Sequence, residues 1–141
     1  MIRYLILGLA LIGIPGFLAA QDDAAPKKHR IDKWLESAID RDPSTAGMVQ
    51  ATSKAAEMWD SELNGVYKQL LEVLSKSQVE KLKASQRKWL EYRDAEFAFS
   101  DEFYGSMQGT MWRPVAVNSR MDIVRSRTLE LQSYLETLSG Q

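Results

Sequence analysis

Residues 44–74, STAGMVQATSKAAEMWDSELNGVYKQLLEVL, contain the clearest secondary-structure signal in the chain. Apolar or small side chains recur there at three- and four-residue steps, which place them on one face of a helix. They are Met48, Thr52, Ala55, Met58, Trp59, Leu63, Val66, Tyr67, Leu70, Leu71 and Leu74. The pair Asn64-Gly65 is typical of hairpin turns, but the apolar period continues through it. The stretch therefore predicts one long helix with a weak point at Gly65, where glycine costs about 1 kcal/mol relative to alanine.

Two further long helices are predicted after this one. Capping-box spacing within residues 75–80 (SKSQVE) indicates that the second begins there, and Gly105 is a plausible end. The loop Gly105–Arg113 (GSMQGTMWR) follows, after which Pro114 can open a third helix in its first turn. The apolar stripe of that helix continues to Leu138.

A shorter helix is predicted upstream, where apolar residues recur at helical spacing from Ile31 to Ile39. Asp42-Pro43 then breaks the helix, and a hydroxyl side chain after it can cap the next one. No segment shows strand-like alternation. The predicted fold is all-α: a short N-terminal helix, a long helical hairpin, and a third long helix packed on the hairpin.

Composition excludes several classes of chemistry. A chain of 141 residues indicates one domain, and the absence of cysteine excludes disulfides, thiolate nucleophiles and cysteine-based zinc sites. A single histidine, His29, argues against a multi-histidine metal site or a Ser-His-Asp triad. The net charge of −1 argues against nucleic-acid binding. We therefore expect no catalytic residues, no metal and no cofactor, and the chain is predicted not to be an enzyme.

The first twenty residues have the layout of a secretory signal peptide. A basic start at Arg3 is followed by an apolar run and by a small-residue end at Leu18-Ala19-Ala20. Pro15-Gly16 interrupts the run too early for a membrane anchor. We expect cleavage after Ala20 and a periplasmic or secreted protein with no membrane attachment afterwards. Residues 21–30 then form a flexible mature N-terminus with His29 exposed, and residues 31–141 form the helical domain.

Polar residues interleave with the apolar stripe of the second long helix. Gln86, Arg93 and Phe97 are spaced by seven and four residues and so share a face with the core. A half-buried Arg93 needs a carboxylate partner, because an unpaired buried charge costs several kcal/mol. The available acids are Asp60, Glu62, Glu96 and Glu130. This pattern predicts a polar network that sets helix register, with a ligand-binding cluster as the alternative, and substitution of Asp60 or Arg93 by alanine is expected to destabilise the protein.

These same positions carry a family resemblance. The stretch from Trp59 to Phe97 is similar to the central signature of LprI-like lysozyme inhibitor domains, with an acid before Leu-Asn and a Tyr, then Gln-Arg-x-Trp and Tyr-Arg-Asp-Ala. The matching residues are Asp60, Leu63, Asn64, Tyr67, Gln86, Arg87, Trp89, Tyr92, Arg93, Asp94 and Ala95. The resemblance extends over residues 38–138, and we expect the signature residues to be structural.

One departure from the family pattern concerns its cysteines. The positions that match them here are Arg41, Ala51, Phe97 and Ser119, so the disulfides that the resemblance implies cannot form. Removing a native disulfide typically costs about 2–5 kcal/mol. The domain is therefore expected to be stabilised by packing instead, with Phe97 able to fill core volume.

The resemblance implies export to the cell envelope and inhibition of a lysozyme as protein partner. An inhibitor must occlude a cleft whose working groups are two carboxylates, for which an exposed loop with an Arg beside aromatic anchors is suited. Gln108, Trp112 and Arg113 on the loop 105–113 are the predicted partner-binding residues. Alternatively, the loop merely closes the end of the helices, and the protein is a structural or interaction module of the cell envelope without lysozyme activity.

Overall fold

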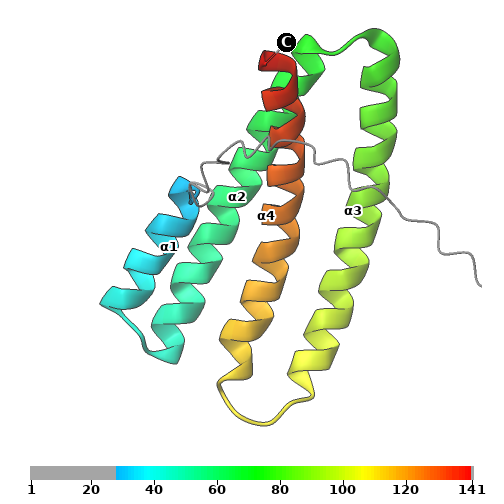
Figure 1. Ribbon diagram of the computed structural model, residues 1–141. Coiled ribbons are helices and arrows are strands. Elements are labelled where there is room, and N and C mark those ends of the chain that lie inside the picture. The colour runs from blue at the N-terminus through cyan, green and yellow to red at the C-terminus, as the bar shows by residue number, and fades with distance from the viewer. Residues whose placement is uncertain (1–27, 141) are drawn as a thin grey trace, which may run out of the picture.

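The computed structural model describes residues 28–140, which form four helices. They are α1 (Arg30–Arg41), α2 (Thr45–Val73), α3 (Lys76–Gly105) and α4 (Trp112–Ser139). As Figure 1 shows, α2 and α4 run in the same direction and α3 runs against them, while α1 covers the first half of α2. The predicted all-α fold is confirmed, and within the described residues there is no strand. The predicted signal peptide lies outside the described residues.

Helix boundaries follow from local capping chemistry. Ser44 caps α2, its Oγ accepting a hydrogen bond from the Gly47 N–H at 3.0 Å. Ser75 caps α3 in a complete capping box with Gln78. Each bond satisfies a backbone donor that the first turn of a helix leaves unpaired. The predicted starts of both helices are therefore confirmed, and α2 passes through Gly65 without a break.

The turn between α1 and α2 is tight enough to require glycine at position 47. A Cβ atom there would clash with the backbone oxygen of Asp42. Hydrogen bonds from the hydroxyl and the backbone N–H of Ser44 also lower the pKa of Asp42 below its usual value. Asp42 thus stabilises the turn through its hydrogen bonds with Ser44, and glycine at position 47 leaves room for Asp42.

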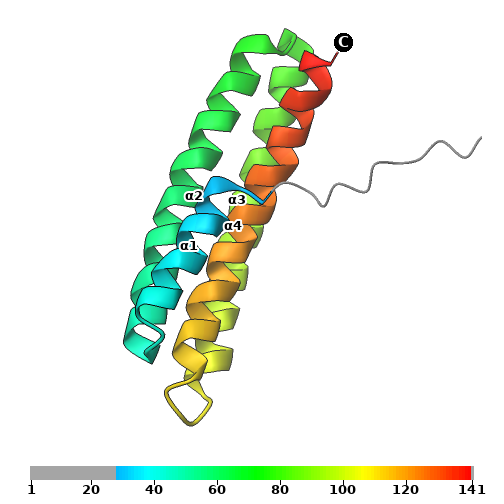
Figure 2. The same cartoon turned by 60° about the vertical axis from the view of Figure 1, so that its left-hand side comes forward.

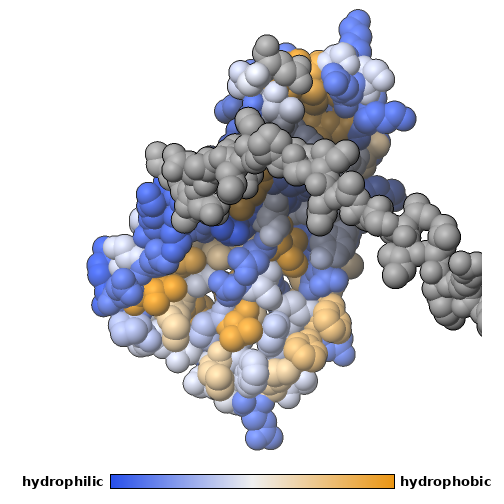
Figure 3. Space-filling view, in the orientation of Figure 1, coloured by the Kyte–Doolittle hydropathy of each residue, from blue (hydrophilic) through white to orange (hydrophobic). Residues whose placement is uncertain are grey.

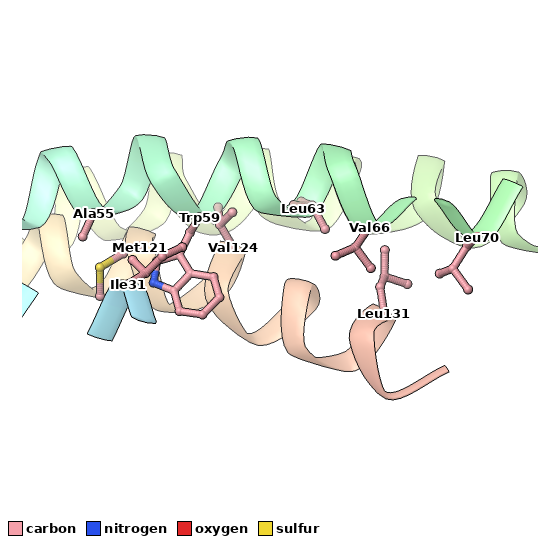
Figure 4. Close-up of a cluster of buried hydrophobic side chains, with 9 residues drawn as sticks. All are labelled: Ile31, Ala55, Trp59, Leu63, Val66, Leu70, Met121, Val124 and Leu131. Atoms are coloured by element: carbon pink, nitrogen blue, oxygen red, sulfur yellow. The ribbon is translucent and has the colours of Figure 1, made fainter. Parts of the chain in front are cut away.

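The core lies between α2 and α4 and is closed by α1. Its nine buried apolar residues, drawn in Figure 4, are Ile31, Ala55, Trp59, Leu63, Val66, Leu70, Met121, Val124 and Leu131. None of them comes from α3, whose one buried residue is Ser100. Helix α3 contributes partly buried side chains, including Leu82, Trp89 and Phe97, and it packs mainly on α4. The closest partner of α2 is therefore α4 and not α3, its neighbour in the predicted hairpin.

His29 is not the exposed tail residue that was predicted. Its Nδ1 accepts a hydrogen bond from the Ile31 N–H at 3.2 Å and so caps α1. Its ring lies 4.3 Å from the ring of the fully buried Trp59, and only 19% of its side chain is exposed. The reason is that packing the imidazole on the indole removes apolar ring surface from water. Among the described residues, the side chain that caps α1 therefore packs on the core.

Candidate functional site

The end of the molecule where α3 meets α4 carries an exposed aromatic cluster. Phe99 and Phe103 stack with ring centroids 5.7 Å apart, and Phe103 contacts Tyr104 edge-on at 5.1 Å. Tyr104 in turn stacks on Trp112 at 6.2 Å. We call these four residues together with Met111 the aromatic tip. In Figure 3, apolar colours gather at the lower end of the molecule, where α3 and α4 meet.

Much of this apolar surface faces solvent. The exposed fractions are 63% for Phe99, 45% for Phe103 and 65% for Met111. Large apolar side chains gathered on a surface mark interaction sites more often than isolated ones do. Trp, Tyr and Arg are also the residues that dominate binding energy at protein interfaces. The composition of the tip is therefore that of a partner-binding surface.

The predicted loop residues lie at this tip, but two of them are not in the loop. Helix α4 begins at Trp112, so Trp112 and Arg113 occupy its first turn. The prediction of a loop extending to Arg113 is wrong because Pro114 lacks only an N–H that the first helical turn leaves unpaired anyway. Gln108 lies in the connection between the helices and is exposed.

The connection itself is shaped by Gly109, whose φ of 101° lies in the left-handed region that favours glycine. Beside it is a hollow of about 430 Å³, lined by nine residues that include Tyr104, Met107, Trp112 and Arg113. Gln108 is not among the lining residues. Sequence reasoning missed Phe99 and Phe103, because at helical spacing they could equally have belonged to the core.

The signature residues lie elsewhere, along α2 and α3. Most of them line a groove of about 380 Å³ between the two helices, namely Asp60, Leu63, Asn64, Tyr67, Gln86, Arg87, Trp89 and Arg93, together with Lys83 and Leu90. Tyr92 and Asp94 are exposed and are not among the lining residues. We call this cavity the α2–α3 groove. The structure thus brings the two halves of the signature together.

The predicted buried pair between Arg93 and a distant acid does not form. Arg93 instead donates to its neighbour Asp94 through Nε at 2.9 Å and Nη2 at 2.6 Å. Its guanidinium also lies 5.4 Å from the ring centre of Trp89. Asp60 is exposed and accepts a hydrogen bond from the Asn64 amide. The reason is that Arg93 satisfies its charge locally while covering an aromatic face.

A different arginine forms the inter-helix network. Arg127 on α4 is buried and donates to Ser85 at 3.0 Å, to Gln86 at 3.1 Å and to Glu130 at 2.7 Å. The predicted polar network at Gln86 therefore exists, but its cation comes from α4. A second cross-link joins α4 to α1, where Arg125 donates twice to Asp32 and has its pKa raised by those hydrogen bonds.

At the positions where the resemblance implies cysteines, the helices are joined by noncovalent contacts. Ser119 shares a hydrogen bond with Ser100 across α3 and α4, with the two oxygens 2.9 Å apart. Phe97, the α3 position that matches a family cysteine, lies three residues before Ser100. Arg41 and Ala51 both line one hollow between α1 and α2. Packing and hydrogen bonds thus hold each of these helix pairs.

Across residues 28–140 there is no group of three or more His, Cys, Asp or Glu side chains placed to hold a metal ion. In the same range no helix combines the length and the apolar character needed to cross a membrane.

The chain is similar to a known family and to a solved structure. A family model described as lysozyme inhibitor LprI matches residues 37–131. No curated protein matches the chain significantly. Among solved structures, an uncharacterized protein from Burkholderia thailandensis is 27% identical, with a TM-score of 0.75 over 80% of this chain. The chain spans 57% of the length of that protein.

Proposed function

The chain belongs to the lysozyme inhibitor LprI family, and from this premise we propose that it is a binding protein that occludes the active-site cleft of a lysozyme. Such a protein acts by binding alone and needs no catalytic residue of its own. The aromatic tip is the surface that we assign to this contact. It stands at one end of an elongated helical body, where the connection between α3 and α4 projects (Figure 2).

The observation that carries the proposal is the exposure of Phe99, Phe103 and Met111 at the tip. Burying these side chains against a partner would release about 25 cal/mol per Å² of apolar surface. Tyr104 and Trp112 already stack on each other, so less side-chain freedom is lost on binding.

A positive charge beside the aromatic tip suits the acidic active site of a lysozyme. Glycoside-cleaving sites use a pair of carboxyl groups, so an inhibitor benefits from a cation at its leading edge. Arg113 is exposed and lines the hollow at the tip. Among the described residues it makes no ion pair, so it keeps its charge available for a partner.

We further propose that the protein is exported. Support comes from residues 1–20, whose basic start, apolar run and Leu-Ala-Ala end fit a cleavable signal peptide. Mass spectrometry of the protein recovered from the cell envelope or medium tests this. The expected mature chain begins at Gln21, and retention of the first twenty residues would contradict export by this route.

A lysozyme turnover assay on bacterial cell walls tests the inhibitory function. Micromolar protein is expected to slow turnover, and the Phe103→Ala and Arg113→Ala variants are expected to weaken inhibition by about tenfold or more each. Tyr92→Ala is the matched control for the aromatic change, because Tyr92 lies on the same helix with 53% exposure but away from the tip. Lys88→Ala serves the same purpose for the charge, because Lys88 is 79% exposed and lines neither the hollow at the tip nor the α2–α3 groove.

Two outcomes would contradict the proposal at different levels. If the Phe103→Ala and Arg113→Ala variants fold normally and inhibit as strongly as the unmodified protein, the lysozyme contact lies on another surface. Complete absence of inhibition by the unmodified protein would favour the alternative, a cell-envelope interaction module that uses the aromatic tip for another protein.

A further inference from the structure

The α2–α3 groove is a second built cavity, separate from the aromatic tip. Helices α2 and α3 stand apart after their shared turn, as both ribbon views show (Figures 1 and 2). The nearest tip residue, Phe99, lies six positions beyond Arg93, a rise of about 9 Å along α3. No residue lines both the groove and the hollow at the tip, so the two are distinct surfaces. The proposed lysozyme contact makes no use of the groove.

The groove is rich in positive charge. Three cations, Lys83, Arg87 and Arg93, line it against one acid, Asp60. Lys83 is paired with Glu80 and Arg93 with Asp94, whereas the side chain of Arg87 makes no ion pair or hydrogen bond with any of residues 28–140. An arginine without a partner at the edge of a cavity is suited to a carboxylate, which it can bind through two parallel hydrogen bonds.

Two amide side chains in the groove are held in fixed orientations. Gln86 accepts from Arg127 Nε through Oε1 at 3.1 Å, which leaves its Nε2 as a donor. Asn64 donates through Nδ2 to the backbone oxygen of Asp60 at 2.9 Å and to its carboxylate at 3.1 Å, which leaves Oδ1 as an acceptor. Pre-oriented donors and acceptors of this kind give a small-molecule site its specificity.

Aromatic groups complete the lining. The partly buried rings of Tyr67 on α2 and Trp89 on α3 belong to opposite sides of the groove. The Tyr67 hydroxyl makes no hydrogen bond within the described part of the chain, so it is another available donor or acceptor. Rings on both sides, with polar groups between them, fit a flat ligand that is apolar on its faces and hydroxylated at its edges.

We propose that the α2–α3 groove binds an acidic sugar, whose carboxylate pairs with Arg87 and whose ring hydroxyls bond to Gln86, Asn64 and Tyr67. A simple anion would use the cations but not the oriented amides or the rings. An acidic peptide would need a longer apolar track than Leu63 and Leu90 provide in the lining. The sugar is the ligand class that uses all three features.

The test is a titration of the ¹⁵N-labelled protein followed by NMR, without lysozyme. The probes are glucuronic acid and N-acetylmuramic acid, each compared with its neutral counterpart, glucose or N-acetylglucosamine. We expect both acids to shift the Trp89 indole signal and the Asn64 and Gln86 amide signals, with a Kd on the order of 1 mM for ligands of this size. The neutral sugars are expected to bind at least tenfold more weakly.

Arg87→Gln is the decisive variant and Lys88→Gln its matched control. Both remove one positive charge from adjacent exposed positions, but Lys88 pairs with Glu91 and does not line the groove. Arg87→Gln is expected to weaken binding of the acidic sugars at least tenfold, and Lys88→Gln by less than twofold. Tyr67→Phe, which keeps the ring, is expected to weaken binding of acidic and neutral sugars alike.

Several results would overturn the proposal. These are no shifts at about 20 mM acidic sugar, equal weakening by the two charge variants, or equal affinity for acid and neutral sugars. Binding of acetate, inorganic phosphate or a glutamate-rich peptide as tight as that of the sugars would identify a general anion or peptide site instead. Because lysozyme is absent from this test, its result is independent of whether the tip inhibits lysozyme.

Discussion

Replacing both Ser100 and Ser119 with cysteine is expected to join α3 to α4 by a disulfide and to raise the free energy of unfolding. In the present protein the two hydroxyl oxygens lie 2.9 Å apart, and the side chains lie 19 positions apart in the sequence. A disulfide needs Cβ atoms about 3.8 Å apart, a separation that two hydrogen-bonded serines can reach. The double variant therefore tests whether the position can carry the covalent staple that this chain lacks.

The expected gain can be worked out from the loop length. Closing a loop of this size lowers the entropy of the unfolded chain by the equivalent of about 3 kcal/mol at 25 °C. Loss of the serine–serine hydrogen bond removes about 1 kcal/mol. The net gain of about 2 kcal/mol corresponds to a rise in Tm of about 6–10 °C for a domain of this size.

Thermal unfolding followed by circular dichroism, with and without reductant, measures this gain. Thiol titration should find no free thiol in the oxidised double variant and two after reduction. The single variants Ser100→Cys and Ser119→Cys are the controls, because neither can form the intramolecular bond. An oxidised double variant with the Tm of its reduced form would refute the geometry or the entropic estimate.

Three further predictions concern stability. Gly47→Ala is expected to lower the free energy of unfolding, measured by urea titration, by about 2–3 kcal/mol, because the added Cβ would clash with the backbone of Asp42. Gly65→Ala should raise it by about 0.5–1 kcal/mol, because a Cβ there meets no atom within 4 Å and alanine favours the helix. Because the pKa of Asp42 is lower in the folded protein than its unfolded value of 3.8, the ionised side chain stabilises the fold above pH 3.8. This contribution to the free energy of unfolding is lost as the pH falls through the folded pKa. An Asp42→Asn variant should therefore lose less stability than the unmodified protein between pH 5 and 2, as measured by circular dichroism. Arg127→Ala is expected to lower the free energy of unfolding by about 3 kcal/mol in the same urea titration, because a buried guanidinium with three partners is lost. Arg93→Ala should lower it by under about 1 kcal/mol, because Arg93 pairs only with its neighbour Asp94.

Sequence periodicity was sufficient to predict the helices. The predicted long helix at 44–74 corresponds to α2, and Ser75 caps α3 within the predicted range. These features depend on contacts within a few residues, which spacing and capping rules describe directly. The start of α4 was placed two residues too late because Pro114 was taken as its first residue, whereas proline is tolerated anywhere in the first helical turn.

Contacts between distant segments could not be predicted from spacing alone. The polar network at Gln86 was predicted, but its cation is Arg127 and not Arg93. Residues on several turns of each helix could have faced one another, and helix rotation selects among them. For the same reason the cover that His29 gives to Trp59 had no signal in the sequence.

The candidate sites were predicted unequally. Trp112 and Arg113 were identified by their residue types in a glycine-containing segment, and the aromatic neighbours that complete the tip were not. The signature residues were expected to be structural. Their gathering around one groove depends on the separation of α2 and α3, which no local pattern encodes.

The single buried residue of α3 has a consequence for the dynamics of the molecule. Helices α1, α2 and α4 share the whole buried apolar cluster, so they can remain assembled while α3 swings outward on its two connections. We expect amide hydrogens of α3 to exchange with solvent through a partial opening that costs less than global unfolding, and those of α2 to exchange only when the whole domain unfolds. Both proposed binding surfaces include α3 residues, so binding at either is expected to slow hydrogen exchange in α3.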